Sequence, residues 1–331
     1  MKTIDLSEWI QRFFQEYLSR QRNVSPATIA AYRDTFRLLL QYFGQKRRRA
    51  PVFLSMENLT APVVLGFLNH LETRRANTVR TRNLRLATLR SFVRYLTDWL
   101  GPELPVLTRR ILAIPFKRQV KPLLGFLTRQ EVEAILDATE DTWTGRRNRL
   151  LFLLLYNTGA RISEVLALRV QDVLPNLAQY LEVRGKGRKH RRLPLWRKTQ
   201  RRLRRWIRDN HLTSEMPLFP NRFGEPLSRF GALQQLHKLV KKASAKQPTL
   251  KRRHISLHSF RHATAMSLLQ SGVVPEVIAL WLGHENPNTT HQYVEADLTM
   301  KRQTLESIAP PRAKADRFRP DGKLLRFLES L

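Results

Sequence analysis

LGHENPNTTHQY, residues 282–293, follows a short apolar segment and places two histidines and a tyrosine in a polar stretch. Taken alone, His284, His291 and Tyr293 fit three interpretations. They could form a surface loop, a metal site, or the reacting end of an enzyme that uses tyrosine as its nucleophile. The choice depends on what the rest of the chain supplies around this stretch.

The composition indicates a folded protein with a polyanionic partner. The 331 residues include 59 Lys and Arg against 27 Asp and Glu, a formal net charge of +32 at pH 7, and 42% are hydrophobic. The hydrophobic content is enough for buried cores, and the length suits two domains. Such an excess of positive charge favours nucleic acid, ahead of a membrane surface, over the alternative of a chance basic surface.

Several classes of protein are excluded or disfavoured. The chain has no cysteine, which excludes disulfides, thiolate zinc sites and cysteine nucleophiles. The first residues, MKTIDLSEWI, lack a signal-peptide core, and the longest apolar run, LLFLLLY (150–156), is far too short to cross a bilayer. We expect a soluble cytoplasmic protein without membrane contact, which associates with the nucleoid when it is bound to DNA.

Residues 1–100 show only helical periodicity. One predicted helix has Ser25 as N-cap and Pro26 at its first position, and it should end at Gly44. Another starts near Thr60 and runs to about Leu71. A further helix carries a cationic face that could contact DNA, with candidate contacts at Arg80, Arg82, Arg85 and Arg90.

The second half of the chain mixes helices with a hairpin. Residues 101–123 contain several prolines and little periodicity, which predicts an extended linker. Thr128 and Glu131 have the spacing of a capping box at the start of a helix. YLEVR (180–184) and RRLPL (191–195) predict two strands around a basic turn. The expected fold is therefore mainly α-helical with a small antiparallel β-sheet.

The segment 184–208 has the highest charge density. Thirteen of its 25 residues are Lys or Arg and none is acidic, whereas a solvated helix face normally mixes both signs. Apolar residues are interleaved, as in a folded element that contacts phosphates, although a solvated basic face is the alternative. The candidate DNA contacts at its start are Arg188, Lys189, Arg191 and Arg192.

A metal site among the histidines is disfavoured. His258, His262, His284 and His291 show no HExxH or other paired-ligand spacing, and no carboxylate joins them in a regular pattern. Each remaining polar candidate, taken alone, also has an ordinary structural explanation. Arg161 could lie on the surface, Lys186 could be a plain hairpin lysine, and Tyr293 could be half-buried.

Together these residues resemble a specific family. Arg161 in TGARISE, Lys186 in GKG, His258-x-x-Arg261, His284 in LGH, and Tyr293 follow the order of the tyrosine site-specific recombinases, which include phage integrases, Xer recombinases and Cre. The resemblance covers about residues 124–300. SPATIAAYRDTF (25–36) also resembles the start of the family's core-binding domain.

The resemblance implies a domain organisation. Residues 1–105 would form a helical core-binding domain, 106–123 a linker, and 124–308 the mixed α+β catalytic domain. Residues 309–331 would be a tail that docks on a neighbouring subunit, with packing on its own domain as the alternative. The additional arm-binding domain of lambda-type integrases is not expected.

The resemblance also implies a role for each signature residue. Arg161 and Arg261 would hold the phosphate oxygens, and Tyr293 would attack the phosphorus to form a 3′-phosphotyrosyl link. Lys186 would protonate the leaving 5′-oxygen. His258 and His284 would bind the phosphate and assist proton transfer, with Glu164 orienting Arg161 or His258. His262 and His291 lie outside the signature and are interpreted as structural residues or phosphate contacts.

The implied function is recombination of double-stranded DNA at an inverted-repeat core site, without metal, ATP or another cofactor. The family works as a tetramer on two synapsed sites, and we expect a monomer or dimer when free. Integration or excision of a mobile element is preferred slightly over resolution of chromosome dimers. A non-catalytic DNA-binding protein, a type IB topoisomerase and a telomere resolvase are the alternatives.

Overall fold

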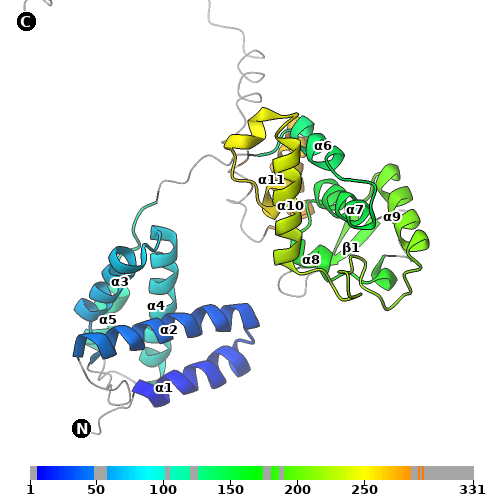
Figure 1. Ribbon diagram of the computed structural model, residues 1–331. Coiled ribbons are helices and arrows are strands. Elements are labelled where there is room, and N and C mark those ends of the chain that lie inside the picture. The colour runs from blue at the N-terminus through cyan, green and yellow to red at the C-terminus, as the bar shows by residue number, and fades with distance from the viewer. Residues whose placement is uncertain are drawn as a thin grey trace, which may run out of the picture. The chain divides into compact units, whose positions relative to one another are not determined.

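The computed structural model describes residues 6–47, 58–100, 105–119, 126–173, 180–185 and 190–284, together with Thr290 and Tyr293. The chain divides into two compact units, Met1–Lys121 and Pro122–Leu331 (Figure 1). Most of the described residues are helical, and the strands among them form a two-stranded antiparallel sheet in the second unit. The predicted fold class is confirmed.

The first unit is built from helices around an aromatic core. Its elements are α1 (Leu6–Arg12), the π-helix η1 (Phe13–Gln21), α2 (Pro26–Arg47), α3 (Ala61–Arg75), α4 (Val79–Leu100) and α5 (Pro105–Ala113). Phe13 is fully buried and packs against the rings of Phe36, Phe92 and Tyr95 at centroid distances of 6.2, 5.2 and 5.4 Å. Burial of large aromatic rings therefore joins η1, α2 and α4.

Two boundaries in this unit differ from the sequence prediction. Helix α2 begins at Pro26 as predicted, but it continues past Gly44 to Arg47. The segment expected to be extended contains α5, because Pro105 occupies a first helical position, where a missing N–H costs nothing. Ile111 and Ile114 are 2% and 4% exposed in the core of the unit, so their burial stabilises this segment against α3 and α4.

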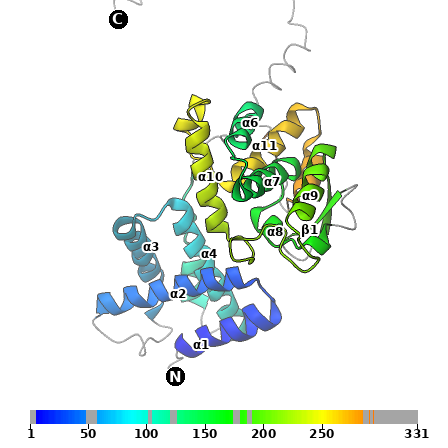
Figure 2. The same cartoon turned by 45° about the vertical axis from the view of Figure 1, so that its right-hand side comes forward.

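The second unit surrounds one buried helix. Its elements are α6 (Arg129–Asp137), α7 (Trp143–Thr158), α8 (Ile162–Leu166), η5 (Val170–Asp172), β1 (Tyr180–Arg184), β2 (His190–Pro194), α9 (Arg197–Asp209), α10 (Arg229–Ala243), η8 (Pro248–Arg252), α11 (Leu257–Gln270) and α12 (Pro275–Leu282). Helix α7 packs against α6, α9 and α11, and these lie around it in Figure 2. The rings of Phe152 on α7 and Phe260 on α11 are stacked 5.4 Å apart.

The predicted local signals appear in this unit. Thr128 Oγ1 accepts a hydrogen bond from Glu131 N, and Glu131 Oε2 accepts one from Thr128 N, which forms the capping box at α6. The strands pair antiparallel with Leu181 opposite Leu193 and Val183 opposite Arg191. This register turns the apolar side chains towards the core and brings Arg191 beside α8.

No helix among the described residues is both long and apolar enough to cross a membrane.

Candidate active site

Two glycines end the helices that border the site. Gly159 ends α7 with φ +62°, and Gly283 ends α12 with φ +66°, in the left-handed region that favours glycine. A Cβ at Gly159 would lie 2.5 Å from Leu282 Cδ2, so the two helix ends pack too closely for a side chain. The close approach places Arg161, at the start of α8, beside the residue that precedes His284.

Arg261 forms hydrogen bonds to both of these helix ends. Its side chain, on α11, is 2% exposed and donates hydrogen bonds from Nη1 to Gly159 O at 2.8 Å and from Nη2 to Leu282 O at 2.7 Å. Loss of water and the nearby Arg161 charge lower the pKa of Arg261 to about 10. The guanidinium therefore remains charged at pH 7, in a site largely closed to water.

Glu164 joins two arginines from different elements. Its carboxylate accepts hydrogen bonds from Arg161 N and Nη1 at 2.8 and 2.9 Å, and from Arg191 Nη1 and Nη2 at 3.1 and 2.6 Å. Burial raises the pKa of Glu164, but the hydrogen bonds from Arg191 and Arg161 outweigh this effect and lower it overall. Of the two partners predicted for Glu164, Arg161 is the one that it contacts.

The geometry gives Arg191 a different position from the one expected. It was predicted as a DNA contact, yet its side chain is only 13% exposed and is paired with Glu164. Arg161 is 33% exposed and also donates from Nη2 to Gly283 O at 3.1 Å. The Arg161 side chain is therefore the more accessible of the two. Arg191 is largely buried and holds the Glu164 carboxylate that also binds Arg161.

Tyr293 lies in this cluster with its hydroxyl on a histidine. The side chain is 1% exposed, and its Oη lies 2.9 Å from His262 Nδ1. The rings of His284 and Tyr293 are stacked 6.2 Å apart, and His284 Nδ1 lies 2.9 Å from the Thr290 hydroxyl. Sequence reasoning missed the contacts of His262 and Thr290, although His262 lies one helical turn after His258 on the same face of α11.

Burial raises the pKa of the Tyr293 phenol and lowers the pKa values of the two neighbouring imidazoles. Burial raises the pKa of Tyr293 to about 12, with a smaller opposite effect from the Arg261 charge. Loss of water, followed by the neighbouring His258 and Arg261, lowers the pKa of His262 to about 4. Loss of water and the charges of Arg261 and Arg161 also lower the pKa of His284 to about 4. At pH 7 the phenol is protonated and both imidazoles are neutral, so His262 Nδ1 can accept the phenolic hydrogen bond.

His258 connects this pair to the solvent. Its ring lies edge-on to that of His262 with centroids 4.5 Å apart, and its side chain is exposed. Partial loss of water and the charges of Arg261, Arg161 and Arg229 lower its pKa as well. The structure thus brings together five of the six predicted catalytic residues, Arg161, His258, Arg261, His284 and Tyr293. Lys186 lies outside the described residues.

The predicted DNA contacts on α4 occupy different environments. Arg80 is exposed, but Arg82 is 4% exposed and donates to Pro115 O at 3.3 Å. Arg85 donates to Ala31 O and to Thr35 Oγ1, both at 2.9 Å, and Arg90 lies over the Phe116 ring. These three side chains contact other segments of their own unit, and the DNA contacts predicted for α4 stay predictions.

Of the predicted contacts in the basic hairpin, Arg192 is exposed and lies over the Tyr180 ring. Arg188, Lys189 and His291 lie outside the described residues.

Among the residues that the structure describes, no group of three or more His, Cys, Asp or Glu side chains could hold a metal ion.

The sequence matches two family models in chain order. Residues 125–300, which include the whole cluster, match the phage integrase family. The chain belongs to this family. Residues 10–98 match the phage integrase N-terminal SAM-like domain.

Curated relatives extend over nearly the whole chain. The putative integrase/recombinase y4rC of Sinorhizobium fredii (strain NBRC 101917 / NGR234) is 43% identical over 331 residues, covering 100% of this chain and 99% of the relative. The tyrosine recombinase XerC of Halalkalibacterium halodurans is 31% identical over 317 residues, covering 93% of this chain and 99% of that relative. The chain is therefore a DNA recombinase of the tyrosine recombinase type.

The fold is also that of solved recombinases. The XerH site-specific recombinase bound to its difH substrate in a pre-cleavage complex matches with a TM-score of 0.65 and 22% identity, covering 91% of this chain and 88% of that one. At this level of identity the likeness establishes the fold.

Proposed function

We propose that this recombinase cleaves and rejoins DNA strands at a specific site through a 3′-phosphotyrosyl intermediate on Tyr293. One observation carries the proposal: the buried Tyr293 hydroxyl is held 2.9 Å from a neutral His262, in the cluster that contains Arg161 and Arg261. Two guanidiniums that are charged at pH 7 suit a pentacoordinate phosphate, because they can stabilise its extra negative charge without a metal ion.

In this mechanism the Tyr293 oxygen forms a bond to phosphorus while the bond from phosphorus to the 5′-oxygen breaks. Arg161 and Arg261 hold the non-bridging oxygens. The Nε of Arg261 is buried and has no hydrogen-bond partner among the described residues, so a phosphate oxygen could supply the acceptor that it lacks. His284, oriented by Thr290, would provide a further phosphate contact.

Two proton transfers accompany the attack. His262 takes the proton that Tyr293 loses, and the adjacent exposed His258 can exchange protons with water. Lys186, which follows β1 and precedes β2 in the sequence, gives a proton to the leaving 5′-oxygen. Rejoining runs the same steps backwards, with the 5′-hydroxyl of the incoming strand as the nucleophile.

The proposed substrate is double-stranded DNA with an inverted-repeat core site. Residues 1–105 and 124–308 would bind it as two domains, and of the residues 106–123 between them, those of α5 pack on the first domain. Arg80, Arg188, Lys189 and Arg192 are proposed DNA contacts. The active assembly would be a tetramer on two synapsed sites, formed from monomers or dimers and associated with the nucleoid. We favour movement of a mobile element over resolution of chromosome dimers, supported by the net charge of +32.

The tail at residues 309–331 is proposed to dock on a neighbouring subunit. A chain truncated after Pro320 should bind single sites normally but lose cooperative synapsis, measured by gel shift with paired sites. Unchanged synapsis by the truncated chain would eliminate the exchange of tails.

A plasmid assay distinguishes recombination from related reactions. The binding site is first selected from genomic DNA by its affinity for the chain, and two copies are placed on a supercoiled plasmid. The proposal predicts recombinant products in excess EDTA and without ATP, and none from a plasmid with no site. Relaxation of a plasmid without sites would favour a type IB topoisomerase instead, and hairpin ends would favour a telomere resolvase.

A further inference from the structure

Helix α9 carries a cationic stripe that the proposed reaction does not use. Four basic residues recur along one side of this helix at spacings of three and four, namely Lys198, Arg201, Arg202 and Arg205. The opposite side is buried in the core, through Thr199, Leu203, Trp206 and Ile207. The helix is thus fixed on the unit with its stripe directed away from the core.

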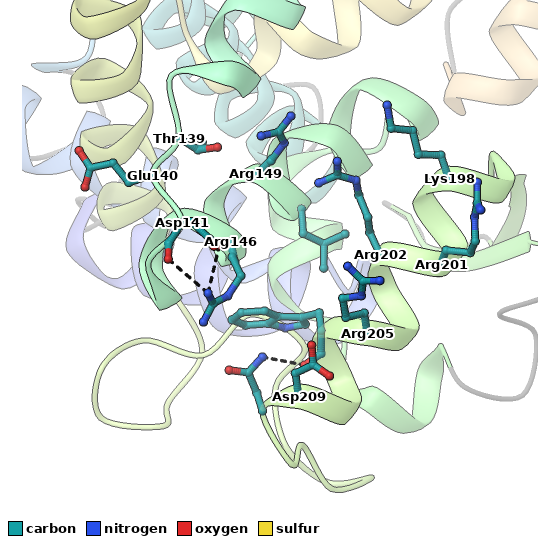
Figure 3. A pocket seen from close by; sticks show the side chains of 13 residues that line it. Thr139, Glu140, Asp141, Arg146, Arg149, Lys198, Arg201, Arg202, Arg205 and Asp209 are labelled. Atoms are coloured by element: carbon teal, nitrogen blue, oxygen red, sulfur yellow. Dashed lines mark hydrogen bonds and ion pairs between the residues drawn. The ribbon is translucent and has the colours of Figure 1, made fainter.

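This stripe borders a hollow of about 470 Å³ between α9, α7 and the loop at residues 139–141. Leu150 and Trp206 line it, and Trp206 is held in place by a 2.9 Å hydrogen bond from Nε1 to Leu218 O. Lys198, Arg201, Arg202 and Arg205 of α9 line the hollow, and in Figure 3 Arg202 reaches towards Arg149 of α7. None of the catalytic candidates lines it, so the hollow is separate from the Tyr293 cluster.

The charges around the hollow are unbalanced. Six cationic residues line it, namely Arg146, Arg149, Lys198, Arg201, Arg202 and Arg205, and three acidic residues, Glu140, Asp141 and Asp209. Asp141 pairs with Arg146 at 3.1 Å, and Arg149 pairs with Asp137 at 2.8 Å. Glu140 and Asp209 pair with Lys242 and Arg208, which lie outside the hollow. Within the described part of the chain, the four cations of α9 have no ion pair.

Arg202 is the most enclosed of these four. Its side chain is half-buried, and its pKa is lowered by loss of water and then by the charges of Arg149 and Arg205, with Asp137 acting in the opposite direction. Like charges held close together in a partly dehydrated hollow repel one another, and a bound anion would relieve this repulsion. A solvated face would spread its charges apart or alternate their sign.

We propose that this hollow binds adjacent phosphate groups, with Arg202 at its centre and Lys198, Arg201 and Arg205 around it. Guanidinium groups match phosphate oxygens with two parallel hydrogen bonds, and several uncompensated cations favour a ligand with more than one phosphate. The hollow is also larger than a single phosphate requires. Two sources have this chemistry, namely the backbone of duplex DNA beyond the recombining site and a free oligophosphate.

Two full-length variants with equal loss of charge on the same helix provide the test. The hollow variant carries Arg201→Gln, Arg202→Gln and Arg205→Gln. The control variant carries Arg197→Gln, Arg204→Gln and Arg208→Gln, which replace exposed arginines that do not line the hollow. Tripolyphosphate binding is measured by calorimetry. Binding to a 40-base-pair duplex without a recombination site is measured across a series of salt concentrations.

The hollow variant should bind tripolyphosphate at least tenfold more weakly than the control variant, which should match the unmodified chain. If its DNA affinity also has a shallower salt dependence, by about 0.9 in log–log slope for each lost phosphate contact, DNA backbone is the ligand. An unchanged slope with lost tripolyphosphate binding identifies a free oligophosphate as the ligand. Equal tripolyphosphate binding by the two variants would overturn the proposal.

Folding and catalysis are checked separately. The melting temperatures of the two variants report whether the helix is intact, and Arg205→Gln alone, at an exposed position, should weaken tripolyphosphate binding in the same direction. Because the measurements need no strand cleavage, they do not depend on the role of Tyr293.

Discussion

The hydrogen bond between Tyr293 and His262 allows the proposed base to be separated from a positioning contact. His262→Asn places an amide oxygen near the position of Nδ1, 2.9 Å from the phenol, and can keep the hydrogen bond without accepting the proton. His262→Leu removes both abilities. If His262 only positions Tyr293, the Asn variant should cleave at nearly the normal rate while the Leu variant loses a modest factor.

The magnitude follows from the two acidities. With a pKa of about 12, Tyr293 is protonated at pH 7, so its attack requires a base. With a pKa of about 4, nearly all His262 is neutral at pH 7 and most of it still is at pH 5. General-base catalysis contributes roughly 10²- to 10⁴-fold, whereas one neutral hydrogen bond contributes about 0.5–1.5 kcal/mol, up to roughly tenfold in rate. Both variants should therefore cleave at least about 100-fold more slowly.

The assay is single-turnover cleavage of a nicked suicide duplex that carries the selected binding site, with site affinity measured in parallel by gel shift. Affinity should change less than about threefold, because both substitutions leave Arg161 and Arg261, the proposed phosphate contacts, with their own hydrogen bonds. His254→Asn, at an exposed histidine before α11, serves as the matched control. A His262→Asn rate within about fivefold of normal would refute the role as base, and a normal His262→Leu rate would refute any role.

Three further predictions test the surrounding groups. The pKa values of His262 and His284 are about 4 in the folded chain and about 6.5 in the unfolded chain. Between pH 4 and pH 6.5 the unfolded chain therefore binds more protons than the folded chain. Stability is therefore fully present above pH 6.5 and falls as the pH drops towards 4, by about 1–2 kcal/mol per histidine at pH 5 in urea unfolding. The double variant His262→Asn/His284→Asn should lose less between pH 7 and 5, and an identical loss would contradict the assignment. Glu164→Gln should lower the free energy of unfolding by about 2–3 kcal/mol, since Arg191 is left buried without its charge partner, whereas the exposed Glu133→Gln should change it by less than about 0.5 kcal/mol. Equal effects in these two variants would remove Glu164 from its bridging role. Lys186→Ala should slow cleavage much less when the leaving 5′-oxygen is replaced by sulfur, a better leaving group, and equal slowing on both substrates would exclude Lys186 as the acid.

Much of the fold could be predicted because its signals are local. The capping box of Thr128 and Glu131 and the helix end at Gly283 depend on only a few neighbouring residues. Pro105 misled the prediction, because the same residue that interrupts a helix also begins one. Helix α10 was not anticipated, and among its residues only Ala232, Leu236 and Ala243 are buried, which is a weak apolar pattern.

In the candidate site, too, the features set by the local sequence were predicted, and those set by packing were not. The order of its residue types could be read from the sequence, but their contacts depend on packing between distant segments. His262 and Tyr293 are 31 residues apart, and their hydrogen bond exists only because Tyr293 is buried against α11. Arg85 likewise becomes an internal residue because α2 brings Ala31 O and Thr35 within 2.9 Å of its guanidinium. Helical periodicity alone could not distinguish such arginines from those on a DNA-binding face.

The central claim is that Tyr293 becomes covalently attached to a DNA end, and the most direct measurement is capture of that intermediate. The chain is incubated with the nicked suicide duplex, the mixture is denatured, and the adduct is digested and mapped by mass spectrometry. The account predicts a DNA-linked peptide that contains Tyr293, attached to a 3′-phosphate. It also predicts no adduct from Tyr293→Phe, although that variant binds the same duplex normally. An adduct from the Tyr293→Phe chain, or a linkage mapped to another residue, would contradict it.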